Sequence, residues 1–468
     1  MTQPASSDPA AQPLPDVRAR VGEHLMRRDI GLLAAIAVII NATIGTGIFK
    51  SPGRILRLTG TEDAALAIWV LGGIIAFCGA LSLAELAAAL PRTGGMYEHL
   101  KRAWGKKVAF LFIWTRLVLL VPAAIGTFAL LAGDALVALL NLTPDPTTNR
   151  LFSVGVIVVA AALNVVAVKQ SAIQQVVVTG AKYLGVLLLA GVGLLIAVPP
   201  YAPPPIPIDV VNATTVTGAG IFAALVAVMW VYDGWADLAH VAGEVRNPAK
   251  NMPRALAIGA LAITAVYLLV NLGYLRVLGG DGLRSATTGA DMVAARLGAA
   301  TFGELGQRVV SGLVLVSCLG AAMGMLLTGP RTFVPVSADG EFVRWLGHVS
   351  PKTGVPWPAV LTCAALGSVF VWSRTFEQLS EAFVAGAFPF YTLVVLAVPM
   401  LRRREPNLKR PFRVPLYPLP VIVFVAGATA LMVGAVQEAD IFSVVALAVV
   451  LAGLGVEALY RRSRASVA

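Results

Sequence analysis

The chain is poor in charged residues. Only 13% of its 468 residues are charged, against 57% that are hydrophobic, and the mean hydropathy is +0.80. A soluble surface needs more charge than this, so the composition excludes a string of soluble domains and indicates a protein that crosses a membrane many times. The net charge of +11 does not indicate a nucleic-acid partner, because the positive residues follow a membrane topology, as described below.

Residues and motifs of common active sites are also scarce. The three cysteines, Cys78, Cys318 and Cys363, lie in apolar runs, and no two of the four histidines are four residues apart. Walker, G-x-S-x-G and H-E-x-x-H motifs are missing from the sequence. No cluster of His, Asp and Glu residues converges at one interface, as an integral membrane enzyme would need. We therefore expect no metal site, no cofactor, no ATP-driven step and no enzymatic activity.

Long apolar runs are what the sequence does contain. A membrane span needs about 20 apolar residues, and twelve runs qualify: roughly 30–50, 64–90, 108–140, 151–168, 173–198, 217–243, 254–278, 306–330, 357–374, 379–401, 416–436 and 438–460. An even number of spans puts both termini on one side. Most of the 36 Lys and Arg residues then lie on that side, so the positive-inside bias predicts cytoplasmic termini in an all-α integral membrane protein.

The first span contains the stretch N-A-T-I-G-T-G-I-F at residues 41–49, where Gly45 and Gly47 flank Thr46. Such a stretch either packs tightly against a neighbouring helix or breaks its own helix. A break is tolerated at membrane depth only where the backbone is buried in protein or lines a watery cavity. The free N–H groups at the start of the second half-helix then favour an anion such as a carboxylate.

The sixth span has a second interruption, M-W-V-Y-D-G-W at residues 229–235. Asp233 is costly in mid-span, so it should line a cavity or pair with another group, such as Lys182 or a helix N-terminus. Trp230, Tyr232 and Trp235 either line a pocket or pack. Paired interruptions in corresponding spans indicate a transporter built from inverted repeats.

This pattern divides the chain into six parts. They are a disordered cytoplasmic tail at 1–27, a first repeat of spans 1–5 at 28–200, a second repeat of spans 6–10 at 216–401, a basic cytoplasmic loop at 402–415, spans 11 and 12 at 416–460, and a cytoplasmic tail at 461–468. The basic loop is expected to set the topology and to contact anionic lipid.

Three charged residues inside spans have open interpretations. Lys182 in span 5 lies roughly 15 Å from the cytoplasmic end, where it either snorkels or takes part in coupling or gating. Arg116 in span 3 is closer to that end, so snorkelling is favoured. Glu85 near the inner end of span 2 is expected to pair with a basic residue of an inner loop, as a gate or as an anchor.

An ordered series of motifs resembles the amino acid–polyamine–organocation transporter superfamily, and most of all bacterial members of its L-amino-acid transporter branch. The resemblance covers residues 28–462. The motifs are T-I-G-T-G-I-F at 43–49, A-E-L at 84–86, T-G-G-M-Y at 93–97, A-K at 181–182, Y-D-G-W at 232–235, G-E-V-R-N-P at 243–248 and the Pro-rich stretch at 410–420.

The resemblance implies a LeuT-type fold of 5+5 inverted helices plus two more, in the bacterial inner membrane. The substrate would bind at the unwound stretch 43–47, which includes Ile44, and at the break of span 6. The α-carboxylate would be bound by N–H groups of Gly45, Thr46 and Gly47, and the α-amine by carbonyls of Thr43, Trp230, Val231 and Asp233.

The resemblance also bears on coupling and partners. Lys182 maps near the place where sodium-coupled relatives bind sodium, which implies sodium-independent transport by exchange or with protons. The outer loops contain no cysteine for a disulfide-linked heavy chain, so we expect none. Met323 stands where some relatives have Asn, which indicates an apolar or small side-chain pocket.

We therefore expect secondary active transport of neutral L-amino acids by alternating access. A cationic amino acid or a polyamine is the main alternative, because Asp233 could reach a second positive charge. A channel ranks lower, since channels usually repeat a filter around an axis and this chain has no such repeat.

Overall fold

The computed structural model describes residues 30–91, 94–166, 168–196, 218–286, 292–437 and 441–465. All regular elements in these ranges are helices, and the one strand-like feature is an isolated bridge between Ile30 and Val245. The all-α prediction is confirmed for this part of the chain. The expected tail at 1–27 and the end of the tail at 461–468 lie outside the described residues.

The first half of the chain folds into a broken pair followed by long helices. Its elements are α2 (Leu32–Thr43), α3 (Gly47–Thr59), α4 (Glu62–Ala89), α5 (Met96–Trp104), α6 (Lys106–Thr115), the π-helix η2 (Arg116–Leu120), α7 (Val121–Leu139), α8 (Pro146–Val166) and α9 (Val168–Leu195). We call the end of the spans where Ile30 and Glu85 lie the inner end, and the end where Lys50 and Arg54 lie the outer end.

The second half repeats this order of a broken pair followed by long helices. Its elements are α11 (Gly218–Val231), the 3-10 helix η3 (Trp235–Glu244), α12 (Pro248–Ser285), α13 (Val293–Thr328), η4 (Pro330–Thr332), α14 (Phe333–Ala338), η5 (Arg344–Gly347), α15 (Trp357–Ser373) and α16 (Phe376–Arg404). Two further helices follow, α17 (Leu419–Gln437) and α18 (Ile441–Ala465).

These helices coincide with the apolar runs of the sequence. Within the described residues, 6 helices are long and apolar enough to cross a membrane, and the α2–α3 pair, bent by 51° at its break, makes up to 7. Shorter apolar helices occupy the remaining runs, at Lys182–Leu195, Gly218–Val231, Trp357–Ser373, Leu419–Gly434 and Val444–Tyr460. The chain is therefore a multi-pass membrane protein.

The end of the first span differs from its prediction. The first span was expected to end near residue 50, but α3 continues to Thr59 and includes Lys50 and Arg54. These basic side chains are tolerated in the helix because acidic residues of α7 and α16 pair with them, as described below.

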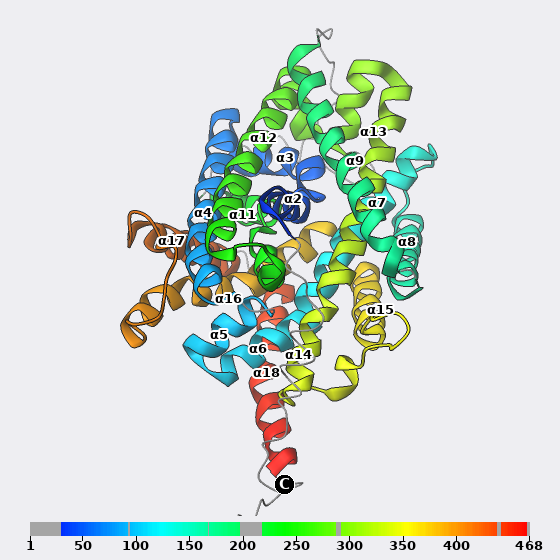
Figure 1. Cartoon of the computed structure of the whole chain (residues 1–468). Coiled ribbons are helices and arrows are strands. Elements are labelled where there is room, and N and C mark those ends of the chain that lie inside the picture. The colour runs from blue at the N-terminus through cyan, green and yellow to red at the C-terminus, as the bar shows by residue number, and fades with distance from the viewer. Residues whose placement is uncertain are drawn as a thin grey trace, which may run out of the picture.

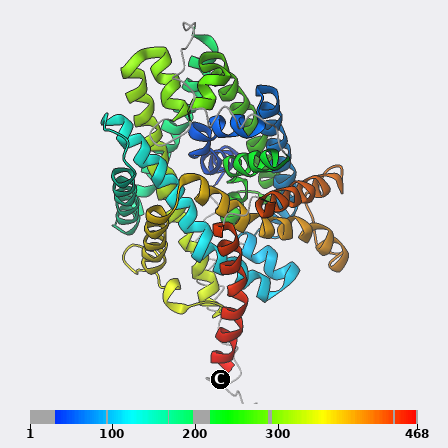
Figure 2. The ribbon, with the colours of Figure 1, turned by 180° about the vertical axis from the view of Figure 1, so that it is seen from behind.

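The broken helix α2 lies at the centre of the molecule. In Figure 1 it is seen nearly end-on between α12, α11 and α9, and the view from behind again places the blue α2–α3 segment inside the bundle (Figure 2). Around it, α12 packs on α4, α9 and α2, while α7 packs on α13, α8 and α15. Both breaks are thus surrounded by other helices, as backbone that leaves a helix at membrane depth requires.

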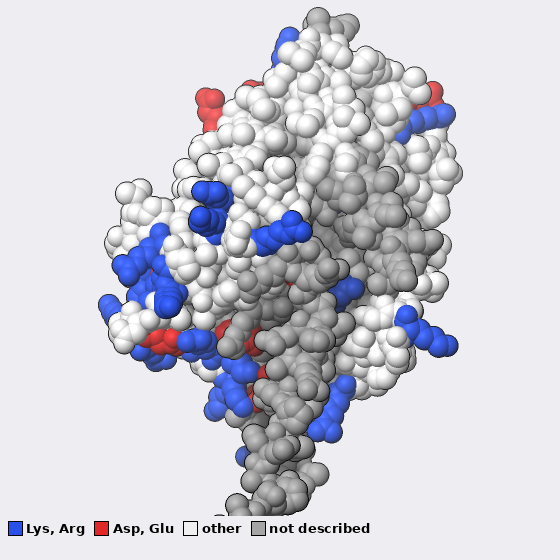
Figure 3. Space-filling view, viewed as in Figure 1, with Lys and Arg blue, Asp and Glu red and all other residues white. Residues whose placement is uncertain are grey.

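The outer surface of the bundle is largely apolar. The face in Figure 3 is mostly uncharged, with Lys and Arg gathered mainly toward its lower left. The apolar side chains exposed at the surface of the bundle include Leu184 and Leu188 of α9 and Leu261 of α12. Such a surface suits contact with lipid tails.

Candidate functional site

The break in the first span leaves backbone donors at the start of α3. Helix α2 ends at Thr43, residues 44–46 are not helical, and α3 begins at Gly47. The N–H of Gly45 donates to the carbonyl oxygen of Thr43 at 2.8 Å. In the described part of the chain, the N–H groups of Thr46 and Gly47 have no backbone acceptor. Two of the three predicted carboxylate donors are therefore available to an anion.

The break in the sixth span lies directly against the first. Helix α11 ends at Val231, and η3 begins at Trp235 after a turn in which Gly234 has φ +120°. A Cβ atom on Gly234 would lie 2.6 Å from the carbonyl carbon of Ala42, and one on Gly47 would lie 2.4 Å from Cγ2 of Val231. Glycine at both positions is what allows the two breaks to touch.

A tyrosine that the sequence analysis did not single out joins the two breaks. The hydroxyl of Tyr267, in α12, lies 2.8 Å from the carbonyl oxygen of Thr43 and 3.1 Å from that of Val231. The Tyr267 hydroxyl has one proton to share between these two carbonyl oxygens, and the Thr43 oxygen also accepts from the Gly45 N–H. Of the predicted amine ligands, the Val231 carbonyl and the Asp233 side chain therefore have more capacity for a substrate than Thr43.

A cavity lies between the two breaks. From the first span it is lined by Thr43, Gly45, Thr46 and Gly47, and from the sixth by Trp230, Val231, Asp233 and Asp237. The hydroxyls of Thr43 and Thr46 are buried and have no partner within the described residues. The cavity volume is about 30 Å³, enough for about two water molecules. Its walls must therefore separate to admit an amino acid.

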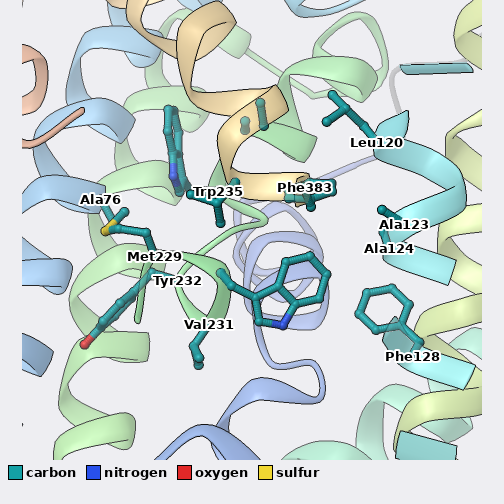
Figure 4. Packing of buried hydrophobic residues seen from close by; sticks show 14 of the residues in the cluster. Ala76, Leu120, Ala123, Ala124, Phe128, Met229, Val231, Tyr232, Trp235 and Phe383 are labelled. Carbon is teal, nitrogen blue, oxygen red and sulfur yellow. The ribbon is translucent and has the colours of Figure 1, made fainter. Parts of the chain in front are cut away.

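The rest of the cavity wall is apolar. Phe128 of α7 and Phe383 of α16 flank Trp230, with ring centroids 5.8 and 5.0 Å from its indole, and Met325 of α13 completes the wall. In Figure 4, Phe128 and Phe383 lie around the same space as Val231. In span 8, Met323 was the residue expected near the pocket. Met325, two residues further along α13, lines the cavity instead.

Two predicted site residues do not line the cavity in this structure. Ile44 is buried in the core. Tyr232 points away from the cavity (Figure 4), and its hydroxyl donates to the carbonyl oxygen of Trp69 at 3.0 Å. Trp235, for which a pocket role was left open, packs on Tyr391 and Phe424 instead.

Asp233 faces the cavity and has a partner behind it. The hydroxyl of Tyr391, in α16, donates to Oδ1 of Asp233 at 2.8 Å. The carboxylate also interacts electrostatically with Asp237, one helical step further along η3, and with Arg116 across the bundle. Two acidic side chains thus line the cavity, and Arg116, which does not line it, has a smaller electrostatic effect on Asp233.

The snorkelling prediction for Arg116 is wrong. Its residue exposure is only 7%, it lies in the π-helix η2, and its guanidinium carbon is 5.7 Å from the centroid of Phe112. Its Nε has no hydrogen-bond partner in the described part of the chain. The guanidinium lies over the Phe112 ring, a cation–π contact that favours its buried position.

Lys182 lies beside the break of the first span. It is 3% exposed, and its Nζ lies 3.5 Å from both the carbonyl oxygen and Oδ1 of Asn41, in the last turn of α2. A side chain of span 5 thus contacts the first span. A buried ammonium on the last turn of a helix has its charge at the negative end of the helix dipole.

Glu85 pairs with the basic loop, as expected. Arg402 donates to both of its carboxylate oxygens, at 2.9 and 2.5 Å, Arg410 lies 3.6 Å away, and the N–H of Val414 donates at 2.8 Å. Since Glu85 is 1% exposed, this loop does more than contact lipid. It is fastened to the inner end of α4.

The outer end carries a second set of ion pairs. Nζ of Lys50 lies 3.1 Å from Asp134 of α7 and 3.8 Å from Glu377 of α16, and Arg54 pairs with Glu381 of α16. These contacts hold α3, which starts at the break of the first span, against two neighbouring helices.

Two broken helices enclosing a polar cavity, with free N–H groups on one side and carboxylates on the other, define a membrane carrier for a small zwitterion. The family model described as amino acid permease matches residues 30–454. The chain belongs to this family, within the amino acid–polyamine–organocation superfamily.

Curated relatives agree with that assignment. The chain is 30% identical over 405 residues to the serine/threonine exchanger SteT of Bacillus subtilis, covering 86% of this chain and 90% of that protein. It is 28% identical over 425 residues to the b(0,+)-type amino acid transporter 1 of Mus musculus, covering 88% and 84%. It is also 28% identical over 420 residues to the mouse Asc-type amino acid transporter 1, covering 88% and 77%. The family is one of amino acid transporters, not enzymes.

Proposed function

We propose that this protein transports neutral L-amino acids across the bacterial cytoplasmic membrane, independently of sodium, by exchange or with protons. The observation that carries the proposal is the polarity of the cavity. The free N–H groups of Thr46 and Gly47 lie at the start of α3, and the carboxylate of Asp233 and the carbonyl of Val231 belong to the sixth span. An α-carboxylate at the first pair and an α-amine at the second satisfy both groups of a zwitterion.

Neutral side chains are favoured by Arg116. Its guanidinium interacts with Asp233 and offsets part of the negative charge that would attract a cationic side chain. The wall formed by Phe128, Phe383 and Met325 suits an apolar or small side chain, and the unpartnered hydroxyls of Thr43 and Thr46 suit a small polar one. The serine/threonine exchanger among the relatives is consistent with this choice.

A cationic amino acid is the second candidate. Asp233 and Asp237 both line the cavity, so two carboxylates are available, one for the α-amine and one for a side-chain charge. This alternative requires that Arg116 offsets little of the negative charge of Asp233.

The proposed mechanism is alternating access in a LeuT-type arrangement of twelve spans, with inverted repeats at 28–200 and 216–401 and both termini cytoplasmic. Helices α7, α8, α13 and α15 pack on one another and form a scaffold. The broken spans α2–α3 and α11–η3 would rock against it. Opening to the outside would require the Lys50–Asp134 and Arg54–Glu381 pairs to separate.

Lys182 would control the position of the first span. Its ammonium contacts the last turn of α2 at Asn41, so it supplies a positive charge there without a bound sodium ion. Release of this contact would free α2 to move. Glu85 and the loop at 402–415 would keep the inner end of α4 fixed while this happens.

Counterflow in proteoliposomes tests the proposal. Vesicles loaded with unlabelled alanine receive labelled alanine outside, with and without sodium, together with excess leucine, serine, lysine or putrescine. Uptake that requires internal amino acid, ignores sodium and is blocked by leucine and serine is expected. Uptake blocked mainly by lysine or putrescine would instead establish the cationic candidate, and uptake that does not saturate would indicate a channel.

A further inference from the structure

The loop that joins α16 to α17, residues 402–415, has six basic residues and one acidic residue. Three of the basic side chains are used inside the protein. Arg402 and Arg410 lie at the carboxylate of Glu85, and Arg404 donates to a backbone carbonyl near the end of α5 at 3.1 Å. These contacts fix the course of the loop.

The other three basic residues of the loop, Arg403, Lys409 and Arg413, point outward. All three are exposed, and their side chains have no hydrogen bond and no acidic partner within the described residues. The acidic residue of the loop, Glu405, is already paired with Arg102 of α5. Lys and Arg gather at the lower left of Figure 3, around the ends of α16 and α17 that Figure 1 shows there. Three positive charges therefore remain uncompensated on this surface.

Apolar side chains are exposed directly beside these charges. Leu416 is 79% exposed, and Leu419 and Ile422, one turn apart at the start of α17, are 54% and 57% exposed. A soluble anion would leave these side chains in water. Positive charges next to exposed apolar groups at the start of a membrane helix instead suit an anionic phospholipid, whose phosphate and acyl chains contact one kind of group each.

Helix α17 also reaches the break of the sixth span. The ring of Phe424, in α17, lies 5.9 Å from that of Trp235, the first residue of η3. The Trp235 ring is 5.4 Å from that of Tyr391, whose hydroxyl donates to Asp233 in the cavity wall at 2.8 Å. Side chains in contact thus connect α17 with the substrate cavity.

Helix α4 closes this contact from the other side. A Cβ atom on Gly79 would lie 2.6 Å from Cε2 of Phe424 and 2.9 Å from Cζ2 of Trp235. The same helix carries Glu85, to which the basic loop is fastened. Because packing this close leaves no free space, α17 cannot shift against α4 without displacing the Trp235 ring.

We infer that Arg403, Lys409 and Arg413, together with the apolar start of α17, form a docking site for anionic phospholipid, and that the docked lipid raises the rate of transport. The inference goes beyond the proposed function, which includes no regulation. The headgroup phosphates pair with the three basic side chains, and the acyl chains lie on Leu419 and Ile422.

A ligand shifts a conformational equilibrium only if it binds the two states unequally. The contact between Phe424 and Trp235 provides that difference here, because Trp235 belongs to the broken span that is proposed to move while α17 lies outside it. Lipid that holds α17 in one position therefore favours one position of the break.

The test compares alanine counterflow in vesicles of phosphatidylcholine alone with counterflow in vesicles that also contain phosphatidylglycerol. We expect phosphatidylglycerol to speed counterflow by about fivefold. The combined variant Arg403→Gln, Lys409→Gln and Arg413→Gln should lose this stimulation. In phosphatidylcholine alone it should stay within about twofold of the unaltered protein, because none of the three residues lines the cavity.

Binding is measured separately in detergent, with a fluorescently labelled phosphatidylglycerol and energy transfer from the tryptophans of the protein. Each basic side chain near an anionic headgroup strengthens binding about fivefold, so the combined variant should bind this lipid about a hundredfold more weakly. Inorganic phosphate should not displace the labelled lipid. Displacement by phosphate would show a site for a soluble anion and overturn the lipid assignment.

The matched control is the combined variant Lys107→Gln, Arg344→Gln and Lys352→Gln, which removes three exposed basic residues from other loops. It should keep both the stimulation and the binding. Arg403→Lys with Arg413→Lys should also keep both, because the charges are retained. Equal losses in the two glutamine variants would show an effect of overall surface charge and overturn the docking site.

Phe424→Leu tests the connection to the break. This variant should bind the labelled lipid normally and lose most of the stimulation, with size-exclusion chromatography as the check on folding. Full stimulation in Phe424→Leu would overturn the connection through Trp235. An unaltered protein that exchanges alanine equally in both kinds of vesicle would overturn the regulation and leave amino acid transport standing. Absence of counterflow in both would overturn the transport proposal instead.

Discussion

The hydroxyl of Tyr267 lies 2.8 Å from the carbonyl oxygen of Thr43, the last residue of α2. The same hydroxyl is 3.1 Å from the carbonyl oxygen of Val231, the last residue of α11. One side chain of α12 thus holds the ends of both half-helices, next to the cavity. The connection between the two breaks therefore depends on a residue outside both of them.

Replacing this tyrosine tests its role. Tyr267→Phe keeps the buried ring and removes the hydroxyl, so we expect a loss of about 1–3 kcal/mol in stability, because buried carbonyls lose a donor. Tyr274→Phe is the control on the same helix, since the Tyr274 hydroxyl is buried without a partner among the described residues. Thermal unfolding in detergent measures both. Equal melting temperatures for the two variants would show that the hydroxyl does not hold the breaks.

The contact of Lys182 with Asn41 predicts a transport defect. Lys182→Met keeps the length of the stem and removes the ammonium 3.5 Å from the end of α2. We expect the exchange rate to fall about tenfold, in the range of typical coupling energies, with a changed pH profile. Lys250→Met, on an exposed lysine at the start of α12, is the control. A Lys182→Met protein with normal rate and normal pH dependence would refute the switching role.

Arg116 is predicted to set selectivity. Arg116→Met removes the positive charge that interacts with Asp233. Lysine should then compete with labelled alanine about tenfold more strongly, while leucine competes as before. Arg254→Met, an exposed arginine of α12, provides the comparison. Unchanged competition by lysine would mean that Arg116 does not offset the charge of Asp233.

Glu85 is predicted to stabilise the inner end. Glu85→Gln leaves two arginines without their buried partner, and breaking such a pair costs about 3–5 kcal/mol. Glu304→Gln breaks an exposed pair with Arg308, which is worth about 0–1 kcal/mol. Denaturant titration of both variants in detergent separates these cases. A small and equal effect would show that the basic loop is not anchored through Glu85.

His99 predicts a loss of stability in acid. Burial lowers the pKa of His99 from 6.5 to about 4, so the folded protein holds this ring neutral while the unfolded chain protonates it below pH 6.5. The stabilising contribution is therefore complete above pH 6.5 and is lost as the pH falls toward 4, by on the order of 3 kcal/mol. Melting temperatures between pH 7.5 and 4.5 should fall less steeply in His99→Gln. Parallel curves would contradict the prediction.

Local chemistry made much of the fold predictable. The twelve apolar runs coincide with helices because a span is defined by its own length and hydrophobicity. Both breaks were found because Gly45, Gly47, Asp233 and Gly234 are unusual residues inside such runs. The pairing of Glu85 with a basic residue was also expected, from its position near the inner end of span 2.

The sequence by itself thus determined the class, the spans and the two interrupted segments, since each depends on residues that are neighbours in the chain. Only the tertiary structure decided which groups meet across the bundle. Tyr391 reaches Asp233, Tyr267 reaches Thr43, and Gly95 packs against His240 over separations of more than 100 residues. Local periodicity contains no information on such pairs, because helix packing brings them together and the burial that follows sets their chemistry.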